Sequence, residues 1–175
     1  MNQPYPARPS NLKTKERHMS FKKFVLPAAC AISLATAAVA HGQTVGKSAD
    51  QIRWRQSAFT TLAWSMARIK ANVAGEFNKE QVVQAANTIQ ALAHANIGSL
   101  FVAGTNKGKG WQETEVKPEY FTDKAGVDKA WTNFGAAADE LVKVAATGDA
   151  AAVKAQFGKV GEACKGCHDK FHVED

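Results

Sequence analysis

The stretch VGEACKGCHDKFH (Val160–His172) places two thiols and an imidazole at positions that a helix brings to one face. Cys164, Cys167 and His168 stand at i, i+3 and i+4, which are neighbours on a helical surface. From Asp149, an N-cap residue type, the apolar residues leading into the stretch recur every three or four positions. The stretch therefore predicts a helix that carries both sulfurs and the imidazole toward one neighbour.

Three further segments have the apolar period of an amphipathic helix. The expected helices cover about residues 48–73, 78–101, 123–147 and 149–164. Gly75 is a plausible end for the first, and Asn78 with Gln81 predicts a capping box at the start of the second. Between the second and third lies a polar, glycine-rich stretch of about 20 residues, predicted to be a long loop. This pattern favours an all-α fold, an antiparallel four-helix bundle.

Alanines are frequent on the expected inner faces of these helices. Small side chains let helices pack closely, and they also leave room for a large flat ligand between helices. The alanines in question are Ala63, Ala86, Ala93, Ala130, Ala137 and Ala138.

The first 40 residues differ in composition from the rest of the chain. Residues 1–18 are polar and unpatterned, and we expect them to be an upstream extension. Residues 19–40 join a short basic start to an apolar run that ends in A-x-A, which predicts a cleaved signal peptide. The run is short for a membrane span of about 20 residues, so an anchor is less favoured. We expect a periplasmic domain over residues 41–175, without membrane association after cleavage.

The net charge of +6 is unevenly placed along the chain. Six basic residues against one acidic residue give residues 1–40 a net charge of +5, whereas 16 basic against 15 acidic residues give the remainder +1. The expected mature domain is nearly neutral, which removes the main argument for nucleic-acid binding.

The C-x-x-C-H motif has several chemical interpretations. It can attach haem c, with both thiols joined to the macrocycle and the imidazole reaching the iron. A thiol–disulfide redox pair usually lies at the start of a helix, whereas this motif lies at the end of one. A zinc site would need further ligands, and only His41, His94 and His172 remain. Two core cysteines or a local disulfide form the plainest alternative. Export and the helical fold favour one covalent haem c per chain, near the C-terminus of the bundle.

Three segments together resemble the cytochrome c′ family of class II c-type cytochromes. These are VGEACKGCHDKFH, IRWRQSAF (Ile52–Phe59) and ETEVKPEYF (Glu113–Phe121), and the resemblance covers the whole expected mature chain. It implies a four-helix bundle with haem c near the C-terminus, and a homodimer. It also implies that Cys164 and Cys167 form thioethers and that His168 is the proximal iron ligand.

The resemblance extends to residues on the other side of the haem. Arg55 and Gln56 match residues that lie against the haem and its propionates, and Glu113 and Thr114 match loop residues near the haem edge. Phe59 matches an apolar residue over the distal iron face. 

Phe101 is expected to line the distal side as well. We therefore expect an apolar distal pocket without a hydrogen-bond donor, which selects uncharged gases such as NO and CO.

No strong sixth iron ligand is evident. Met66 lies two helical turns from Phe59, about 10 Å along the axis, and is expected to be a core residue. His94 is expected to be an ordinary helical histidine. At His172 the resemblance predicts arginine; the histidine is either a frayed terminal residue or a titratable neighbour of the proximal ligand.

These features predict a non-enzymatic, gas-binding haem protein that can also pass electrons to an unknown redox partner. An electron-transfer cytochrome with a sixth ligand is the alternative. A peroxidase is less favoured because it usually needs a distal base and a polarising arginine. A helical thiol protein without haem is the remaining possibility.

Overall fold

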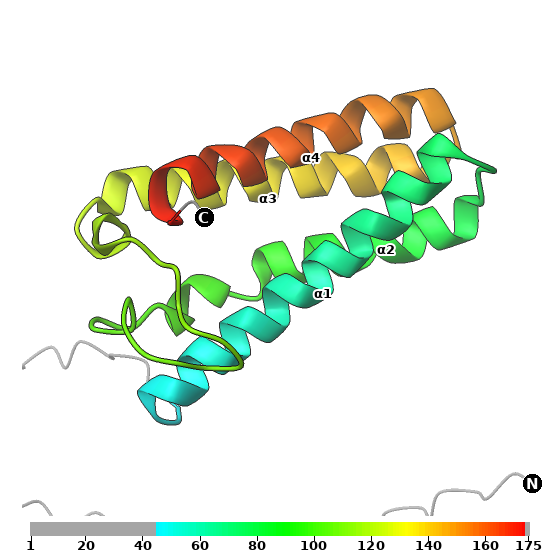
Figure 1. Cartoon of the computed structure of the whole chain (residues 1–175). Helices are drawn as coiled ribbons and strands as arrows, with labels where there is room; N and C mark the ends of the chain where they lie inside the picture. The colour runs from blue at the N-terminus through cyan, green and yellow to red at the C-terminus, as the bar shows by residue number, and fades with distance from the viewer. Residues whose placement is uncertain (1–44, 174–175) are drawn as a thin grey trace, which may run out of the picture. The chain divides into compact units, whose positions relative to one another are not determined.

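The computed structural model describes residues 45–173, which form a bundle of four long helices (Figure 1). The predicted all-α four-helix bundle is therefore confirmed, whereas the predicted extension and signal peptide lie outside the described residues. Within residues 45–173, no helix is both long enough and apolar enough to cross a membrane. The elements are α1 (Ser48–Ala74), α2 (Lys79–His94), η1 (Ile97–Leu100), η2 (Pro118–Phe121), α3 (Lys124–Thr147) and α4 (Ala150–Phe171), with η marking single 3₁₀ turns.

Side-chain caps fix the helix ends close to the predicted positions. The Asn78 side chain accepts a 3.0 Å hydrogen bond from the backbone N–H of Gln81, as a cap should. The reciprocal half of the predicted capping box is different, because Oδ1 of Asn72 accepts the backbone N–H of Asn78. Asp149 accepts from two backbone amides in the first turn of α4. Gly148, with φ of 80°, ends α3 in the left-handed conformation that glycine adopts without strain.

The second helix is shorter than predicted. We expected it to continue to about residue 101, but α2 ends at His94. Asn96 follows with φ of 55°, a left-handed conformation that an α-helix cannot incorporate. The apolar pattern continues beyond this break because Ile97, in η1, is also buried. Periodicity alone therefore merged two separate elements.

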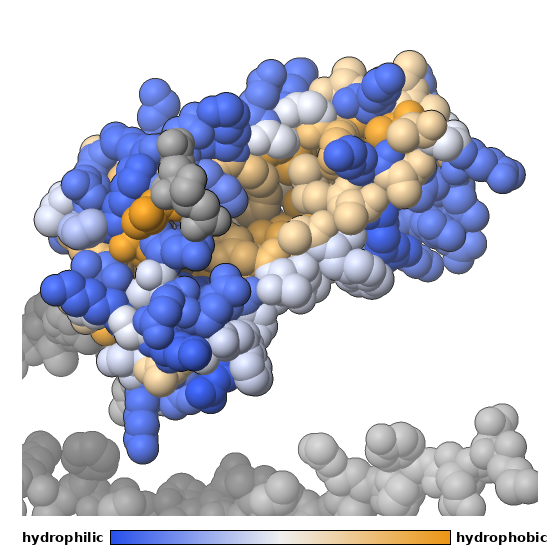
Figure 2. Space-filling view, in the orientation of Figure 1, coloured by the Kyte–Doolittle hydropathy of each residue, from blue (hydrophilic) through white to orange (hydrophobic). Residues whose placement is uncertain are grey.

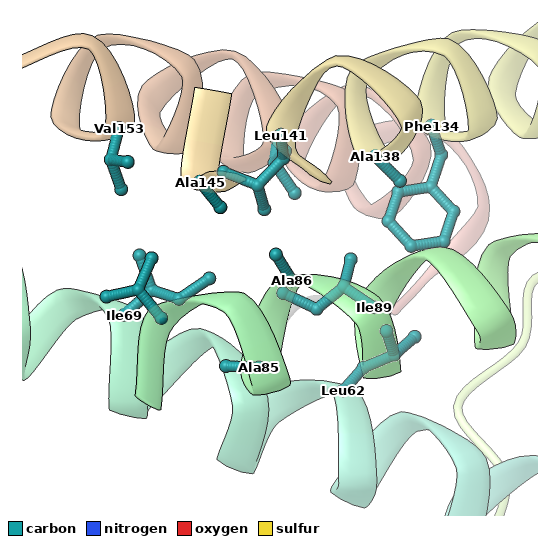
Figure 3. Close-up of a cluster of buried hydrophobic side chains, with 12 residues drawn as sticks. Leu62, Ile69, Ala85, Ala86, Ile89, Phe134, Ala138, Leu141, Ala145 and Val153 are labelled. Carbon is teal, nitrogen blue, oxygen red and sulfur yellow. The ribbon is translucent and has the colours of Figure 1, made fainter. Parts of the chain in front are cut away.

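The core is formed by the facing sides of all four long helices (Figure 3). Ala86 and Ala138 are fully buried, so two of the predicted alanines do bring helices close together. The buried cluster contains Leu62, Ile69, Val82, Ala85, Ala86, Ile89, Phe134, Ala138, Leu141, Ala145, Val153 and Val160.

The start of α1 and the end of α4 diverge, and the segment of residues 101–123 runs between them (Figure 1). This segment is tied to the end of α4 by backbone hydrogen bonds. The N–H of Lys117 donates to the carbonyl of Phe171, and the N–H of Val173 donates to the carbonyl of Glu115, both at 2.8 Å. The long loop is therefore anchored where the C-x-x-C-H motif lies.

Candidate functional site

A cavity of about 370 Å³ lies between α1, α3, α4 and the segment of residues 101–123. Figure 2 shows this part of the surface as a hollow with hydrophobic residues around it and hydrophilic residues farther out. Two of the alanines predicted to leave room for a ligand, Ala63 and Ala130, line it. All nine residues predicted to bind the cofactor line the same cavity: Arg55, Gln56, Phe59, Phe101, Glu113, Thr114, Cys164, Cys167 and His168.

The α4 side of the cavity carries the two thiols. Cys164 and Cys167 are half-buried and are not joined in a disulfide. Burial raises the pKa of both thiols, and Cys164 raises the pKa of Cys167 further. Thiol–disulfide oxidoreductases need a lowered thiol pKa, so this environment is unsuited to that chemistry. Among residues 45–173, no three His, Cys, Asp or Glu side chains gather as a protein-only metal-ion site would require.

His168 faces the same cavity one position after Cys167. Burial lowers the pKa of His168, and the neighbouring His172 lowers this pKa further. A lowered pKa keeps the imidazole neutral near pH 7, which is the form that binds metals. The position and the protonation state of His168 both suit an iron ligand.

His172 is held in place rather than frayed. Its ring stacks on that of His168, with centroids 5.3 Å apart, and its Nε2 lies 3.0 Å from Oε2 of Glu115. It also forms an isolated antiparallel bridge with Val116. The frayed-terminus interpretation of His172 is therefore wrong.

Arg55 is a buried cation in the cavity wall. Only 2% of the residue is exposed, and its guanidinium lies 4.6 Å from the centre of the Phe101 ring. Its nitrogens donate to Oγ1 of Thr105 at 2.7 Å, to Oγ1 of Thr114 at 2.6 Å, and to the carbonyls of Thr105 and Leu100.

All of these acceptors are neutral, and no carboxylate pairs with Arg55 in the described part of the chain. Burial lowers the pKa of Arg55, although the side chain remains charged. Buried charges are normally paired, so this side of the cavity suits an occupant with carboxylates.

Gln56 fastens the loop to α1. Its Oε1 accepts the backbone N–H of Trp111 at 2.8 Å, and its Nε2 donates to the carbonyl of Gln112 at 3.0 Å. A Cβ at Gly110 would lie 2.4 Å from Oε1 of Gln56, so the loop can approach this closely only with glycine there. Gln56 thus shapes the cavity by holding one of its walls.

Several wall residues escaped the sequence-based selection, among them Tyr120 and Trp131. Nε1 of Trp131 donates to the Tyr120 hydroxyl at 2.9 Å, and both side chains line the cavity. The cavity wall therefore carries a hydroxyl and an indole N–H in addition to its apolar rings. The expectation of a distal pocket without a hydrogen-bond donor stays a prediction. The sequence contains Tyr120 within the loop segment that resembles the family, but no periodicity places a loop side chain in a cavity.

The two candidate sixth ligands differ in position. Met66 lines the cavity as well as packing on the core, so it is not purely a core residue. His94 is not among the lining residues, and its Nε2 lies 2.8 Å from Oδ1 of Asp139. His94 is therefore the ordinary helical histidine that was expected. His41 lies outside the described residues.

A family model for cytochrome c′ matches residues 50–172. A cytochrome c′ from Rhodocyclus tenuis is 57% identical over 130 residues, which cover 74% of this chain and 98% of that protein. The chain belongs to the cytochrome c′ family. A cytochrome c′ from Allochromatium vinosum is 44% identical over 144 residues, covering 82% of this chain and 92% of that protein.

Solved cytochromes c′ have the same fold. The structure from Thermochromatium tepidum is 42% identical, covers 75% of this chain and all of its own, and superposes with a TM-score of 0.71. Another, described by an unusual ligand-controlled dimer dissociation, is 44% identical with a TM-score of 0.72 and the same coverage. A ferrous variant from Alcaligenes xylosoxidans with bound NO is 27% identical with a TM-score of 0.67, again with this coverage.

Cytochromes c′ bind haem c covalently, and this chain carries the C-x-x-C-H motif at Cys164–His168. The cavity fits such a group: its volume lies within the range of about 300–1,000 Å³ that is usual for cofactor pockets. Thiols and an imidazole lie on one side, apolar rings on another, and a buried cation on a third. The prediction of haem c as the cofactor is confirmed.

Proposed function

We propose that this cytochrome c′ is a periplasmic gas-binding protein that takes up NO and CO at five-coordinate haem iron. The observation that carries the proposal is the convergence of all nine predicted residues on one largely apolar cavity. Cys164 and Cys167 would form the thioethers, and His168 would be the proximal iron ligand. The haem supplies an open coordination position for diatomic gases and a one-electron couple.

The remaining wall residues would orient the cofactor and select the gas. The Arg55 cation would offset the negative charge of the cofactor's carboxylates, and Gln56 would hold the loop over them. Glu113 and Thr114 line the loop side of the cavity. Phe59 and Phe101, whose ring centroids lie 6.3 Å apart, would cover the distal side and exclude water. An apolar wall of this kind favours small uncharged ligands.

The proposed role is binding and electron transfer rather than enzymatic catalysis. A haem peroxidase usually needs a distal base and an arginine free to polarise the substrate. Among residues 45–173, Arg55 is the one arginine that lines the cavity, and its Nη1 and Nη2 donate to Thr105, Thr114 and Leu100. This engagement leaves Arg55 poorly placed for peroxide chemistry.

Electron transfer with a sixth ligand is the second candidate function. It is favoured by Met66, whose thioether is an established type of haem ligand and whose side chain lines the cavity. Phe59, seven residues earlier on α1, would have to leave the iron uncovered for Met66 to reach it. A redox partner would be needed for this function.

A homodimer would form through α1. Trp64 is 58% exposed on this helix, and the guanidinium of Arg68 lies 4.9 Å from the centre of its ring. Exposed tryptophan with stacked arginine is common at protein interfaces. One related cytochrome c′ is described by its ligand-controlled dimer dissociation, which supports the same assembly for this chain.

The proposed function is tested by titrating the reduced holoprotein with NO and, separately, with CO. We expect one gas molecule to bind per haem. The change in absorbance measures this binding. A holoprotein that binds neither gas would refute the proposal, whereas covalent haem alone would not test it. Expression of the full chain with fractionation of the cells tests the periplasmic location.

A further inference from the structure

Four aromatic side chains form a closed ring of contacts along the cavity wall. Phe59 contacts Phe101 edge-on at 6.3 Å between centroids, and Phe101 stacks on Tyr120 at 4.1 Å. Tyr120 is hydrogen-bonded to Trp131, and Trp131 stacks on Phe59 at 6.5 Å between centroids. The Tyr120 hydroxyl and the Trp131 indole nitrogen are the polar atoms of this ring. The cavity wall that contains Phe59 therefore also contains one polar pair, the Tyr120 hydroxyl and the Trp131 N–H.

The Tyr120 hydroxyl has a hydrogen atom to donate, and no acceptor for it lies in the described part of the chain. The oxygen accepts the Trp131 N–H at 2.9 Å, and no other hydrogen bond to this hydroxyl is present among residues 45–173. Tyr120 is only 8% exposed, and a buried donor without an acceptor costs about 1–3 kcal/mol. Buried hydroxyls are mostly satisfied in native proteins, which suggests that the acceptor belongs to something that occupies the cavity.

The hydroxyl is fixed in position and remains protonated. Besides its stack on Phe101, the Tyr120 ring contacts the rings of Phe121 and Phe171 edge-on, each at 5.6 Å between centroids. Burial raises the pKa of Tyr120 above its ordinary value, so the phenol stays a donor across the neutral range. Three ring contacts and one hydrogen bond leave the side chain little freedom to turn away.

Phe101 is in contact with both the Tyr120 ring and the Arg55 guanidinium. The Tyr120 ring stacks on Phe101 nearly in parallel, at 21°, so it occupies one face of that ring. The Arg55 guanidinium lies 4.6 Å from the centre of the same ring and must therefore cover the other face. Cofactor carboxylates would pair with Arg55, whereas the Tyr120 hydroxyl is bonded to Trp131, which stacks on Phe59.

We propose that the Tyr120 hydroxyl donates a hydrogen bond to the diatomic gas bound in this cavity, and that Trp131 orients it. This inference rests on the proposed gas-binding function. NO is a better hydrogen-bond acceptor than CO when bound to ferrous haem, so the donor favours retention of NO over CO. Tyr120 is thus a specificity-determining residue in an otherwise apolar wall.

The test compares the wild-type holoprotein with Tyr120→Phe, which removes the hydroxyl and keeps the ring. We expect NO release about fivefold faster in the variant, the equivalent of one neutral hydrogen bond of about 1 kcal/mol. The N–O stretching frequency should rise, while CO release changes less than NO release. Trp131→Phe keeps the hydroxyl but loosens its orientation, so its effect should be smaller than that of Tyr120→Phe.

A second measurement needs no variant. The N–O stretch of the wild-type complex should shift when the protein is exchanged into heavy water, and this shift should vanish in Tyr120→Phe. The proposal is overturned if NO release, the N–O stretch and the isotope shift are all unchanged in that variant. It is also overturned if only the reduction potential moves, since the hydroxyl would then serve a cofactor carboxylate. A wild-type protein that takes up neither NO nor CO would instead refute the proposed function.

Discussion

Arg55 on α1 donates a 2.6 Å hydrogen bond from Nη2 to Oγ1 of Thr114, which lies 59 residues further along the chain. The same guanidinium also binds Thr105 and the Leu100 carbonyl. One buried cation thus ties the start of α1 to the beginning and the middle of the loop and faces the cavity. Arg55 therefore stabilises the loop and, in the proposed site, also contributes a positive charge beside the haem.

In the proposed site Arg55 lies beside the haem, where a buried positive charge favours the reduced form. Replacing Arg55 by Met should therefore lower the reduction potential by tens of millivolts. The variant should also lose about 2 kcal/mol of unfolding free energy with its charged hydrogen bonds. Arg55→Lys keeps the charge but not the planar fork, so it should restore the potential more than the stability. Potentiometry and urea unfolding measure the two effects. Equal reduction potentials in the wild type, Arg55→Met and Arg55→Lys would contradict the placement of Arg55 beside the haem.

Replacing Phe59 by Ala should speed CO association about tenfold, the equivalent of about 1.4 kcal/mol of barrier, because the ring crowds the distal face in the proposed site. Phe157→Ala is the control, since Phe157 packs on the core and is not among the lining residues. Flash photolysis of the CO complex gives both rates. If Phe59→Ala and the wild type rebind CO equally fast, Phe59 does not cover the iron.

Replacing Met66 by Leu should leave the optical spectrum unchanged if Met66 is only a wall residue. The swap nearly conserves volume, so it should cost less than about 1.5 kcal/mol of stability. Absorbance spectra of the oxidised and reduced proteins provide the measurement. The conversion of a low-spin to a high-spin spectrum in the variant would identify Met66 as a ligand and favour the electron-transfer function.

Asp139 should contribute stability at neutral pH that is lost in acid. Hydrogen bonds from Gln90 and His94 lower the pKa of Asp139 in the folded protein. A lowered folded-state pKa stabilises the fold above the unfolded-state pKa of about 3.9, and this contribution disappears as pH falls through the folded value. Asp139→Asn should therefore melt below the wild type at neutral pH, with a smaller difference in strong acid. A difference that is independent of pH would contradict this account.

Features that depend on local spacing were predictable from the sequence. Cys164, Cys167 and His168 are three and four residues apart, so forming α4 is enough to place them on one side of the cavity. The four helices followed from apolar periodicity, and the Asn78 and Asp149 caps from residue type at a helix start. Each of these inferences needs only neighbours along the chain.

Features that depend on the path of the loop were not predictable. The bond between Tyr120 and Trp131 joins η2 to α3, and the pair of His172 with Glu115 joins α4 to the loop. Sequence periodicity predicts neither contact, because the path of the loop depends on tertiary hydrogen bonds such as those of Arg55. The early end of α2 at His94 was missed for a related reason, since the burial of Ile97 continues the apolar pattern past the break.

In the proposed function, the haem iron of this cytochrome c′ has one protein ligand and an open distal side. The absorption spectrum of the reduced holoprotein, recorded before and after the addition of CO, tests it most directly. We expect a high-spin ferrous Soret band that shifts when CO is added. A sharp low-spin α band before CO is added, with no change afterwards, would contradict it.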